Sequence, residues 1–342
     1  MRRRTRLGLA TIAALLVAAG AYTAFWFVVA GRLKSGFAAW AQSAQADKID
    51  LSWRKLRVSG YPAAFRINLD AAVLRDTSIM PSPEFRTPIL SGSAHPWDFA
   101  DWRLAMPDGF TADIVATHQR TPVRLAVHNA DGLVSIAPEG GWKLSLTLRD
   151  TTVLAGVNLA AGLAHATITV PPSSPAGRAA PGTVLEVDAS QIKLPIAIGP
   201  MGDSISELSF AATVKGAVPG GNLAEAAAAW RDAGGAIELD NLRLDWGALG
   251  ATAAGTLSLD RDLQPIGELS GAIRGYDQIL TTLVQSGQIR ATDARLARIA
   301  LTILAKTGPD GKPQIQTTFA IQDGQMFLGP ARLGRAPRLT WE

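Results

Sequence analysis

The apolar side chains of residues 236–260 alternate as in a strand and then change phase, and this feature constrains the fold most strongly. Ile237 and Leu239 share one parity, whereas Leu242 and its alternate neighbours take the opposite one. A change of parity without a break in the alternation indicates a β-bulge, and Asp240 with Asn241 suits such a kink. We therefore predict two antiparallel strands that share one apolar face. The residues predicted on this face are Ile237, Leu239, Leu242, Leu244, Trp246, Leu257 and Leu259.

The same change of phase recurs at Asp150 and Asp323, and more faintly at Asp70. The intervals of 80, 90 and 83 residues between these four acidic positions suggest a degenerate repeat of strand, acidic kink and strand. An Asp at a bulge or turn commonly bonds its own backbone, so we interpret these residues as structural rather than as ligands of a metal.

The N-terminal residues 7–31 carry no charge, and as a helix they span about 37 Å, enough to cross a bilayer. Four arginines precede this segment and two basic residues follow it, which predicts a cytoplasmic N-terminus and an exported remainder. In a bacterium, the bulk of the chain would lie in the periplasm, behind a single-pass inner-membrane anchor. The alternative is a cleaved signal peptide with its site at residues 19–21. The aromatic and apolar continuation at residues 25–29 favours the retained anchor, with Trp26 suited to the membrane interface.

The charge and cysteine content exclude several classes of function. Six of the 33 basic residues lie between Arg2 and Lys34, where there is no acidic residue, and the remaining 27 face 29 acidic residues. A nearly neutral body without a basic run offers no footprint for nucleic acid. The absence of cysteine excludes disulfides and thiolate metal sites. The four histidines are scattered, so we predict neither a metal nor a cofactor.

The rest of the chain is organised as many short strands with few helices. We predict an α+β, mainly β fold: an antiparallel, bulged, repeat-like amphipathic sheet with a few covering helices, behind one N-terminal transmembrane helix. The predicted divisions are a cytoplasmic tip and anchor (1–36), a first β-rich half (37–170), a linker or long loop (171–182) and a second β-rich half (183–342). Helices are predicted near 222–233, 277–286 and 292–306, the first opened by a capping box at Asn222 and Glu225. Residues 35–46 are expected to continue the anchor helix as a stalk.

A search for enzyme signatures finds one fragment, Gly202, Asp203 and Ser204, which resembles the nucleophile block of GDSL-type esterases. All four histidines precede this serine, so the downstream general base of such an enzyme is missing, and we interpret the fragment as a turn. A polar site would need residues that are distant in sequence to converge. The residues considered for such a site are His95, His118, Asp101 and Asp113.

Two tryptophans in the loop-rich residues 80–110 stand apart from the periodic segments. Trp97 and Trp102 follow a His-Pro pair and have no regular apolar spacing around them. We consider them candidates for contact with a membrane or a partner, although packing within the fold is the favoured explanation of such residues.

Several runs make the chain resemble a bacterial envelope family that is catalogued only as a domain of unknown function. The runs that carry the resemblance are SGYPAAFRINLD, LDNLRLDWGALG, AGTLSLD, GELSGAIRGYDQIL, SGQI and DGQMFLGPARLG. The resemblance covers nearly the whole chain and implies no established activity or catalytic residue. More distantly, one anchor followed by a long amphipathic sheet is similar to AsmA-like envelope proteins, whose curved sheet offers an apolar trough to lipid; this is an analogy of architecture alone.

We expect a non-enzymatic, membrane-anchored periplasmic protein that binds lipid or maintains the envelope through its apolar sheet face. Its expected partners are the inner membrane and either phospholipid or another envelope protein. The alternative is a scaffold or assembly factor of an envelope complex, in which the sheet is an ordinary closed core.

Overall fold

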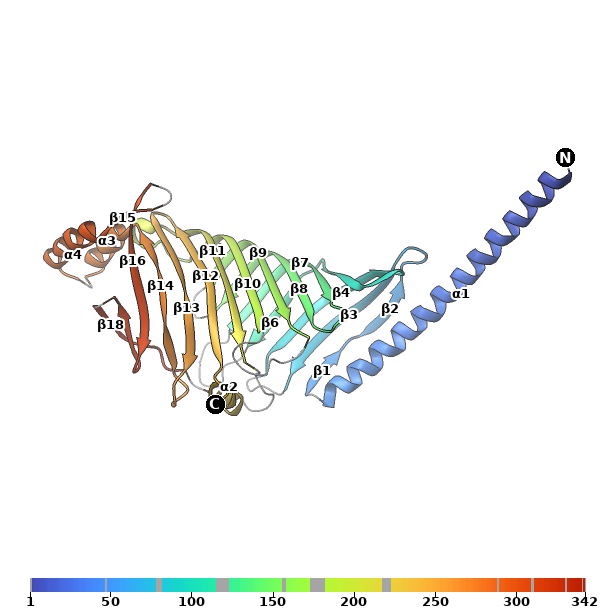
Figure 1. Ribbon diagram of the computed structural model, residues 1–342, viewed down its shortest axis with the longest axis horizontal. Helices are drawn as coiled ribbons and strands as arrows, with labels where there is room; N and C mark the ends of the chain where they lie inside the picture. The colour runs from blue at the N-terminus through green and yellow to red at the C-terminus, as the bar shows by residue number, and fades with distance from the viewer. Residues whose placement is uncertain are drawn as a thin grey trace.

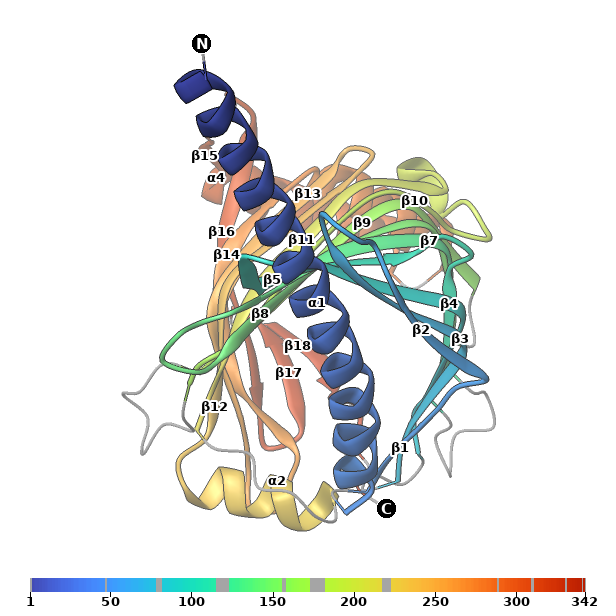
Figure 2. The same cartoon turned by 90° about the vertical axis from the view of Figure 1, so that its right-hand side faces the viewer.

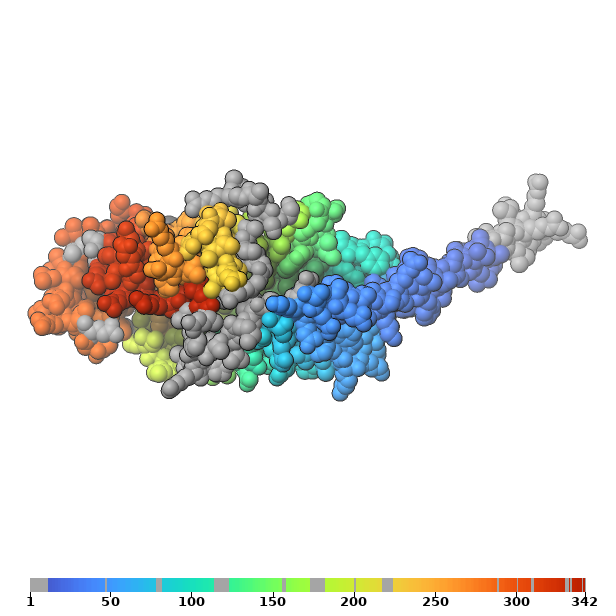
Figure 3. Space-filling view, turned by 90° about the horizontal axis from the view of Figure 1, so that it is seen from below, coloured from blue at the N-terminus to red at the C-terminus, as the bar shows by residue number. Residues whose placement is uncertain are grey.

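The computed structural model describes residues 2–46, 48–77, 82–114, 123–155, 158–172, 182–216, 223–287, 289–308, 311–329, 331–339 and 341. One long helix, α1 (Arg2–Ala46), comes first, and its N-terminal part projects away from the rest of the molecule (Figure 1). Its C-terminal part runs beside the first strands. Seen from below, the body is elongated and α1 leaves it at one end (Figure 3).

All the strands belong to one 18-stranded antiparallel sheet. In chain order, the strands are β1 (Ile49–Ser52), β2 (Lys55–Ser59), β3 (Phe65–Asp76), β4 (Glu84–His95), β5 (Asp98–Met106), β6 (Phe110–Ile114), β7 (Val123–Ile136), β8 (Trp142–Leu154), β9 (Asn158–Val170), β10 (Thr183–Lys193), β11 (Ser204–Lys215), β12 (Ala236–Trp246), β13 (Leu249–Leu259), β14 (Pro265–Arg274), β15 (Lys306–Thr307), β16 (Pro313–Gln322), β17 (Gln325–Leu328) and β18 (Ala331–Arg335).

Consecutive strands are neighbours almost throughout, so the sheet is a long meander. β1 and β2 both pair with β3, and β5 and β6 both lie between β4 and β7, so each of these pairs acts as one interrupted strand. The predicted fold class is confirmed: the protein is mainly antiparallel sheet with an N-terminal apolar helix and few other helices. β9 pairs with β10 along nearly its whole length, so the sheet continues from one predicted half into the other. Most of the predicted linker lies outside the described residues.

The three shorter helices lie at the margins of the sheet. They are α2 (Leu223–Asp232), α3 (Tyr276–Gln285) and α4 (Ala291–Leu304), and a 3-10 turn, η1 (Gly199–Met201), contacts α3. α2 packs through Trp230, whose Nε1 donates a 2.7 Å hydrogen bond to the Lys215 carbonyl. Its predicted cap, Asn222, lies outside the described residues. α3 and α4 lie at the end of the sheet farthest from α1 (Figure 1).

The helix predicted near 292–306 is present as α4, but its apolar side chains do not cover the sheet as predicted. Leu296, Ile299 and Ile303 are between 60% and 78% exposed, and α4 packs against α3. Periodicity predicted the amphipathic helix correctly, but the 3.6-residue period carries no information about which surface the helix meets.

The bulge predicted in β12 is confirmed. The register of β12 shifts by one residue against both of its neighbours, between Leu239 and Leu242. Ile237, Leu239 and Leu242 pair with Leu257, Gly255 and Ala253, which alternate regularly on one face of β13. The extra residue therefore keeps the apolar residues before and after the kink on the same face, as the change of parity predicts.

The other acidic positions lie in different kinds of local backbone structure. Asp323 and Gly324 form a two-residue hairpin turn between β16 and β17, with Gln322 opposite Gln325. Asp150 lies inside β8 with a left-handed backbone (φ 51°), and the register continues unchanged across it. A bulge, a turn and a left-handed residue all change the parity of a strand. The three positions are therefore not equivalent parts of a structural repeat.

Left-handed residues line up across the sheet. Ala71, Asp150 and Gln191 have φ values of 51°, 51° and 55°, and Gly109 has 66°. Strand pairing places these four residues, which we call the crease, in one row on alternate strands from β3 to β10. At this row the alternation of side chains along each strand shifts by one residue. Apolar side chains therefore face the same side of the sheet before and after the crease.

The crease bends the sheet around an apolar core. Met106, Ala130 and Leu148 on one side of the crease pack in one cluster with Phe110 and Val127 on the other side. This contact requires that both sets face the concave side. Viewed along the molecule, the sheet curls into a trough with α1 in front of its opening (Figure 2).

Candidate functional site

The concave face of the trough carries an almost unbroken row of apolar residues from β3 to β14. Residues opposite each other in paired strands share a face, so the pairing can be followed from strand to strand. One such row consists of Ile67, Gly92, Leu104, Gly132, Leu146, Ala166, Val187, Phe210, Leu242, Ala253 and Gly271. The trough is therefore apolar well beyond the strands that α1 contacts.

A groove of about 740 Å³ lies between α1 and this face. Apart from Arg32, no residue with a charged side chain is among the fourteen described residues that line it. Trp102, Leu104 and Ile67 are half-buried, so their apolar surfaces are available to the groove. We call this space the α1 groove. Its lining residues are Val29, Arg32, Leu33, Gly36, Phe37, Trp40, Ile67, Leu69, Leu90, Gly92, Trp102, Leu104, Val134 and Ile136.

Aromatic packing fixes α1 against the sheet on one side of the α1 groove. Trp26 is 4% exposed and stacks on Phe65, with 5.1 Å between ring centroids and 11° between planes. Trp26 Nε1 also donates a 3.3 Å hydrogen bond to the Ala64 carbonyl. Trp26, predicted to suit a membrane interface, thus also packs against the sheet. The continuation of α1 to Ala46 is confirmed, but this part packs on β1 and β2, with Phe37 against Trp53 (5.5 Å), rather than forming a free stalk.

Sequence reasoning missed the α1 side of this groove, although a signal for it is present. Val29, Leu33 and Phe37 are spaced four residues apart, which places them on one helix face. The stripe begins at Val29, within an N-terminal segment that is apolar on every face of the helix, so the stripe does not stand out there.

The two predicted tryptophans lie in different places. Trp102 lines the α1 groove, and its Nε1 donates a 3.1 Å hydrogen bond to the Phe99 carbonyl. Trp97 is 74% exposed at the turn between β4 and β5, where it stacks on His95 with 5.0 Å between centroids.

The seven residues predicted on β12 and β13 share the concave face of these strands. Ile237 lies opposite Leu257, Leu244 lies opposite Ala251, and Trp246 lies opposite Leu249. All seven are half-buried, and Leu242 belongs to the same row as Leu104 of the α1 groove. The structure thus brings this set and Trp102 onto one continuous surface, and it leaves Trp97 at the rim.

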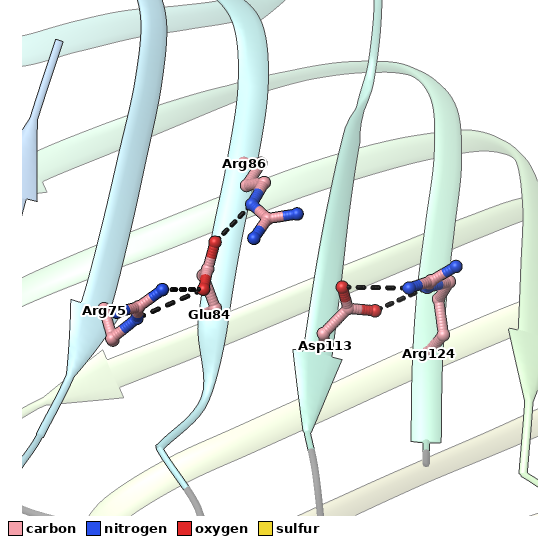
Figure 4. A network of polar contacts seen from close by, with 5 residues as sticks. All are labelled: Arg75, Glu84, Arg86, Asp113 and Arg124. Carbon is pink, nitrogen blue, oxygen red and sulfur yellow. Dashed lines mark hydrogen bonds and ion pairs between the residues drawn. The ribbon is translucent and has the colours of Figure 1, made fainter.

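The convex face carries charge, and Figure 4 shows a network of ion pairs on it. Arg75 Nε donates a 3.1 Å hydrogen bond to Glu84 Oε2, Arg86 pairs with the other oxygen of Glu84, and Arg124 forms two bonds to Asp113. The carboxylates are well shielded, with side-chain exposures of 12% for Glu84 and 19% for Asp113. These five residues, which we call the ion ladder, join β3 to β4 and β6 to β7.

Hydrogen bonds within the ion ladder lower the pKa of both carboxyls. The bonds from Arg75 and then Arg86 hold the pKa of Glu84 below its ordinary value, and the bond from Arg124 does so for Asp113. Arginine stays protonated, so these carboxylates are held in ion pairs rather than poised for proton transfer.

Two of the residues considered for a polar active site, Asp101 and Asp113, lie apart in the described part of the sheet. Asp101 pairs with Ser135 and Asp113 with Arg124, so they lie eleven residues apart along β7, on opposite sides of the crease. His95 Nδ1 is 3.2 Å from the Ala63 carbonyl oxygen. His118 lies outside the described residues. Gly202 follows η1 with φ 76°, and Ser204 begins β11.

These features define a class of protein with one long N-terminal apolar helix packed by its C-terminal half across the mouth of an amphipathic, bent antiparallel sheet. The model of an uncharacterised protein conserved in bacteria, DUF2125, matches residues 26–337. The chain therefore belongs to this family, which confirms the resemblance noted from its motifs. No curated protein and no solved structure matches the chain. The similarity to AsmA-like proteins stays a prediction.

Proposed function

We propose that this protein is a single-pass protein of the bacterial inner membrane whose periplasmic trough binds the acyl chains of phospholipid. The proposed role is binding rather than catalysis. The observation that carries it is the α1 groove of about 740 Å³, whose apolar lining continues along the concave face as far as β14.

Acyl chains fit this surface better than polar ligands do. Transfer of an apolar chain from water to such a lining is favourable, whereas a polar ligand would lose its water without gaining hydrogen bonds. Arg32 is exposed at the rim of the α1 groove, where its guanidinium can pair with a lipid phosphate. A chain with an anionic head and apolar tails therefore matches both parts of the site.

Filling the α1 groove tests this proposal. Gly36 faces the groove, and a side chain added there meets nothing within 4 Å. We expect full-length protein purified in mild detergent to retain phospholipid, detected by native mass spectrometry. Gly36→Trp should lose most of this lipid, because the indole occupies the space of an acyl chain.

The matched control is Gly31→Trp on the same helix. Gly31 is also open, but it lies on a different face of α1, beside Lys34 and Lys55. This variant should retain lipid like the unmodified protein. Equal loss in both variants, or no bound phospholipid in the unmodified protein, would contradict lipid binding by the trough.

The exposed stripe of α4 favours a second function, as a scaffold for another envelope protein. Leu296, Ile299 and Ile303 form an apolar helix face at the end of the molecule opposite the anchor. A photoreactive residue at position 299 that recovers one stable protein from cells, while the purified chain carries no lipid, would favour this function over the first.

A further inference from the structure

Two hairpin tips lie side by side next to α1. One is the turn between β2 and β3, which includes Tyr61 and Pro62, and the other is the turn between β4 and β5, which includes Trp97. The 3.2 Å contact between His95 Nδ1 and the Ala63 carbonyl joins them. Trp97 stacks on His95, so it stays with this pair of turns.

The β2–β3 tip meets α1 near the middle of the helix. The Tyr22 hydroxyl donates a hydrogen bond to the Pro62 carbonyl, and Thr23 Oγ1 lies 2.7 Å from Tyr61 Oη. One turn further along, Trp26 contacts Ala64 and Phe65. The sheet therefore begins beside α1 at the level of Tyr22.

The apolar length of α1 before that level is too short to cross a bilayer. Charge-free residues 7–21 would rise about 22 Å as a helix, whereas the hydrocarbon core is about 30 Å thick and takes roughly 20 residues. Twenty residues counted from Leu7 reach Trp26. The helix segment from Tyr22 to Trp26, with the tip beside it, then lies within the membrane.

The side chains at this level are those that a membrane interface accommodates. Phe25, Phe27 and Val28 on α1 are 49%, 62% and 55% exposed, and Tyr61 and Trp97 on the tips are 47% and 74% exposed. Exposure of these aromatic and apolar side chains to water would be unfavourable in free energy. Tyr and Trp are favoured where the hydrocarbon of a bilayer meets its headgroups.

Two arginines stand just behind the tips on the convex face. Arg66 and Arg103 lie on either side of Ser93 in one row of the sheet. Among the described residues neither has an acidic partner, and Arg103 Nη1 is 3.3 Å from His95 Nε2. Cations at this depth suit the phosphates of a leaflet into which the tips are inserted.

We propose that the β2–β3 and β4–β5 tips insert into the periplasmic leaflet of the bilayer that α1 crosses. Val29, the first α1 residue that lines the α1 groove, lies three residues beyond Trp26, about 4.5 Å further along the helix, so the groove then opens among the lipid headgroups, next to the acyl chains. A lipid has only this short distance to travel between the hydrocarbon and the trough. This inference rests on α1 being a retained anchor, as in the proposed function, but it does not depend on lipid uptake by the trough.

The natural absence of cysteine allows a direct test of depth. Single variants Ala63→Cys and Trp97→Cys report the tips, Leu15→Cys reports the anchor, and Arg261→Cys reports the β13–β14 turn far from α1. Each is labelled with an environment-sensitive fluorophore in the full-length chain. The chain is then reconstituted into vesicles of phosphatidylcholine and phosphatidylglycerol. Quenching by nitroxide on the acyl chains is compared with quenching by iodide in water.

We expect blue-shifted emission and quenching by the lipid nitroxide at positions 15, 63 and 97, and quenching by iodide at position 261. Quenching of positions 63 and 97 by iodide alone, with position 15 still buried in lipid, would overturn tip insertion while leaving the anchor intact. Exposure of position 15 to iodide would overturn both the anchor and the insertion. Lipid retained by the detergent-purified chain is measured separately, so failure of the trough is distinguishable from failure of the tips.

Discussion

Neighbouring residues in β8 show how the bend of the sheet is made. Asp150 holds a left-handed backbone, a conformation that short polar residues tolerate and β-branched residues do not. Thr151, the next residue, turns into the concave side and is 6% exposed, and its hydroxyl has no hydrogen-bond partner among the described residues. The two positions therefore respond oppositely to the same new side chain.

We predict that valine at position 150 destabilises the protein and valine at position 151 stabilises it. Asp150→Val should lower the free energy of unfolding by about 1–2 kcal/mol, because a branched side chain is strained at positive φ. Thr151→Val should raise it by about 1 kcal/mol, because it removes a buried hydroxyl without a partner and keeps the volume. Urea unfolding in detergent, followed by circular dichroism, measures both, and a change of the same sign in both variants would contradict this account of the crease.

At the scale of elements, the ion ladder holds β3 to β4 and β6 to β7 on the convex face below the crease. The arginines that form it are about half exposed, with values of 48% for Arg75 and 53% for Arg124. Solvent screens such pairs, so each contributes modestly, and the ladder tunes the stability of these strands without creating the bend.

We predict an acid-sensitive part of the stability that comes from Glu84 and Asp113. Their pKa values are lowered in the folded chain, so the ladder stabilises fully above the unfolded carboxyl values, about 4. The contribution is lost as the pH falls through the lower folded values. The urea midpoint should therefore fall on acidification below about pH 4, and less so in the Glu84→Gln, Asp113→Asn double variant.

At neutral pH this double variant should lose about 1 kcal/mol of stability, the magnitude of partly exposed ion pairs. Glu139→Gln, in the exposed β7–β8 turn, is the matched control and should leave the acid profile unchanged. An acid profile of the double variant identical to that of the unmodified chain would show that other carboxylates govern the response.

At the scale of the whole molecule, the trough is longer than the helix that lies at its mouth. Leu242 of β12 and Leu104 of the α1 groove belong to one apolar row, and five strands lie between β5 and β12 along it. A lipid in the α1 groove would therefore find the same kind of surface further along the sheet.

We predict that lipid contacts both ends of this row. A photoreactive residue in place of Leu104 or Leu242 should crosslink to phospholipid during reconstitution. The same residue in place of Arg243, which is exposed and adjacent to Leu242, should not crosslink because it faces the opposite side. Crosslinking at position 104 alone would confine lipid to the α1 groove, and equal crosslinking at 242 and 243 would indicate non-specific contact with detergent or bilayer.

What the sequence could predict depended on how local each signal is. The bulge in β12 was predictable because Ile237, Leu239 and Leu242 record their change of parity within six residues. The crease was not predictable, because Ala71, Asp150 and Gln191 become one row only through the register of the strands between them. One half of the α1 groove lies on a helix and the other half on β3, β4, β5 and β7. The sequence therefore contains the apolar stripe of α1 but does not indicate which strands it faces. The apolar stripe on α4 is equally clear in the sequence, yet it faces solvent, so such a stripe alone does not show that a helix covers the sheet.

Because α1 packs against the first strands, the length of the trough can change without a change in how α1 is attached. Neighbouring strands are about 4.8 Å apart, so each strand added beyond β7, the last strand that lines the α1 groove, extends the trough by that distance and leaves the groove unchanged. In the proposed membrane arrangement, evolution could thus lengthen or shorten the reach of such a protein from the bilayer by whole hairpins. The proposed anchor and inserted tips would stay the same.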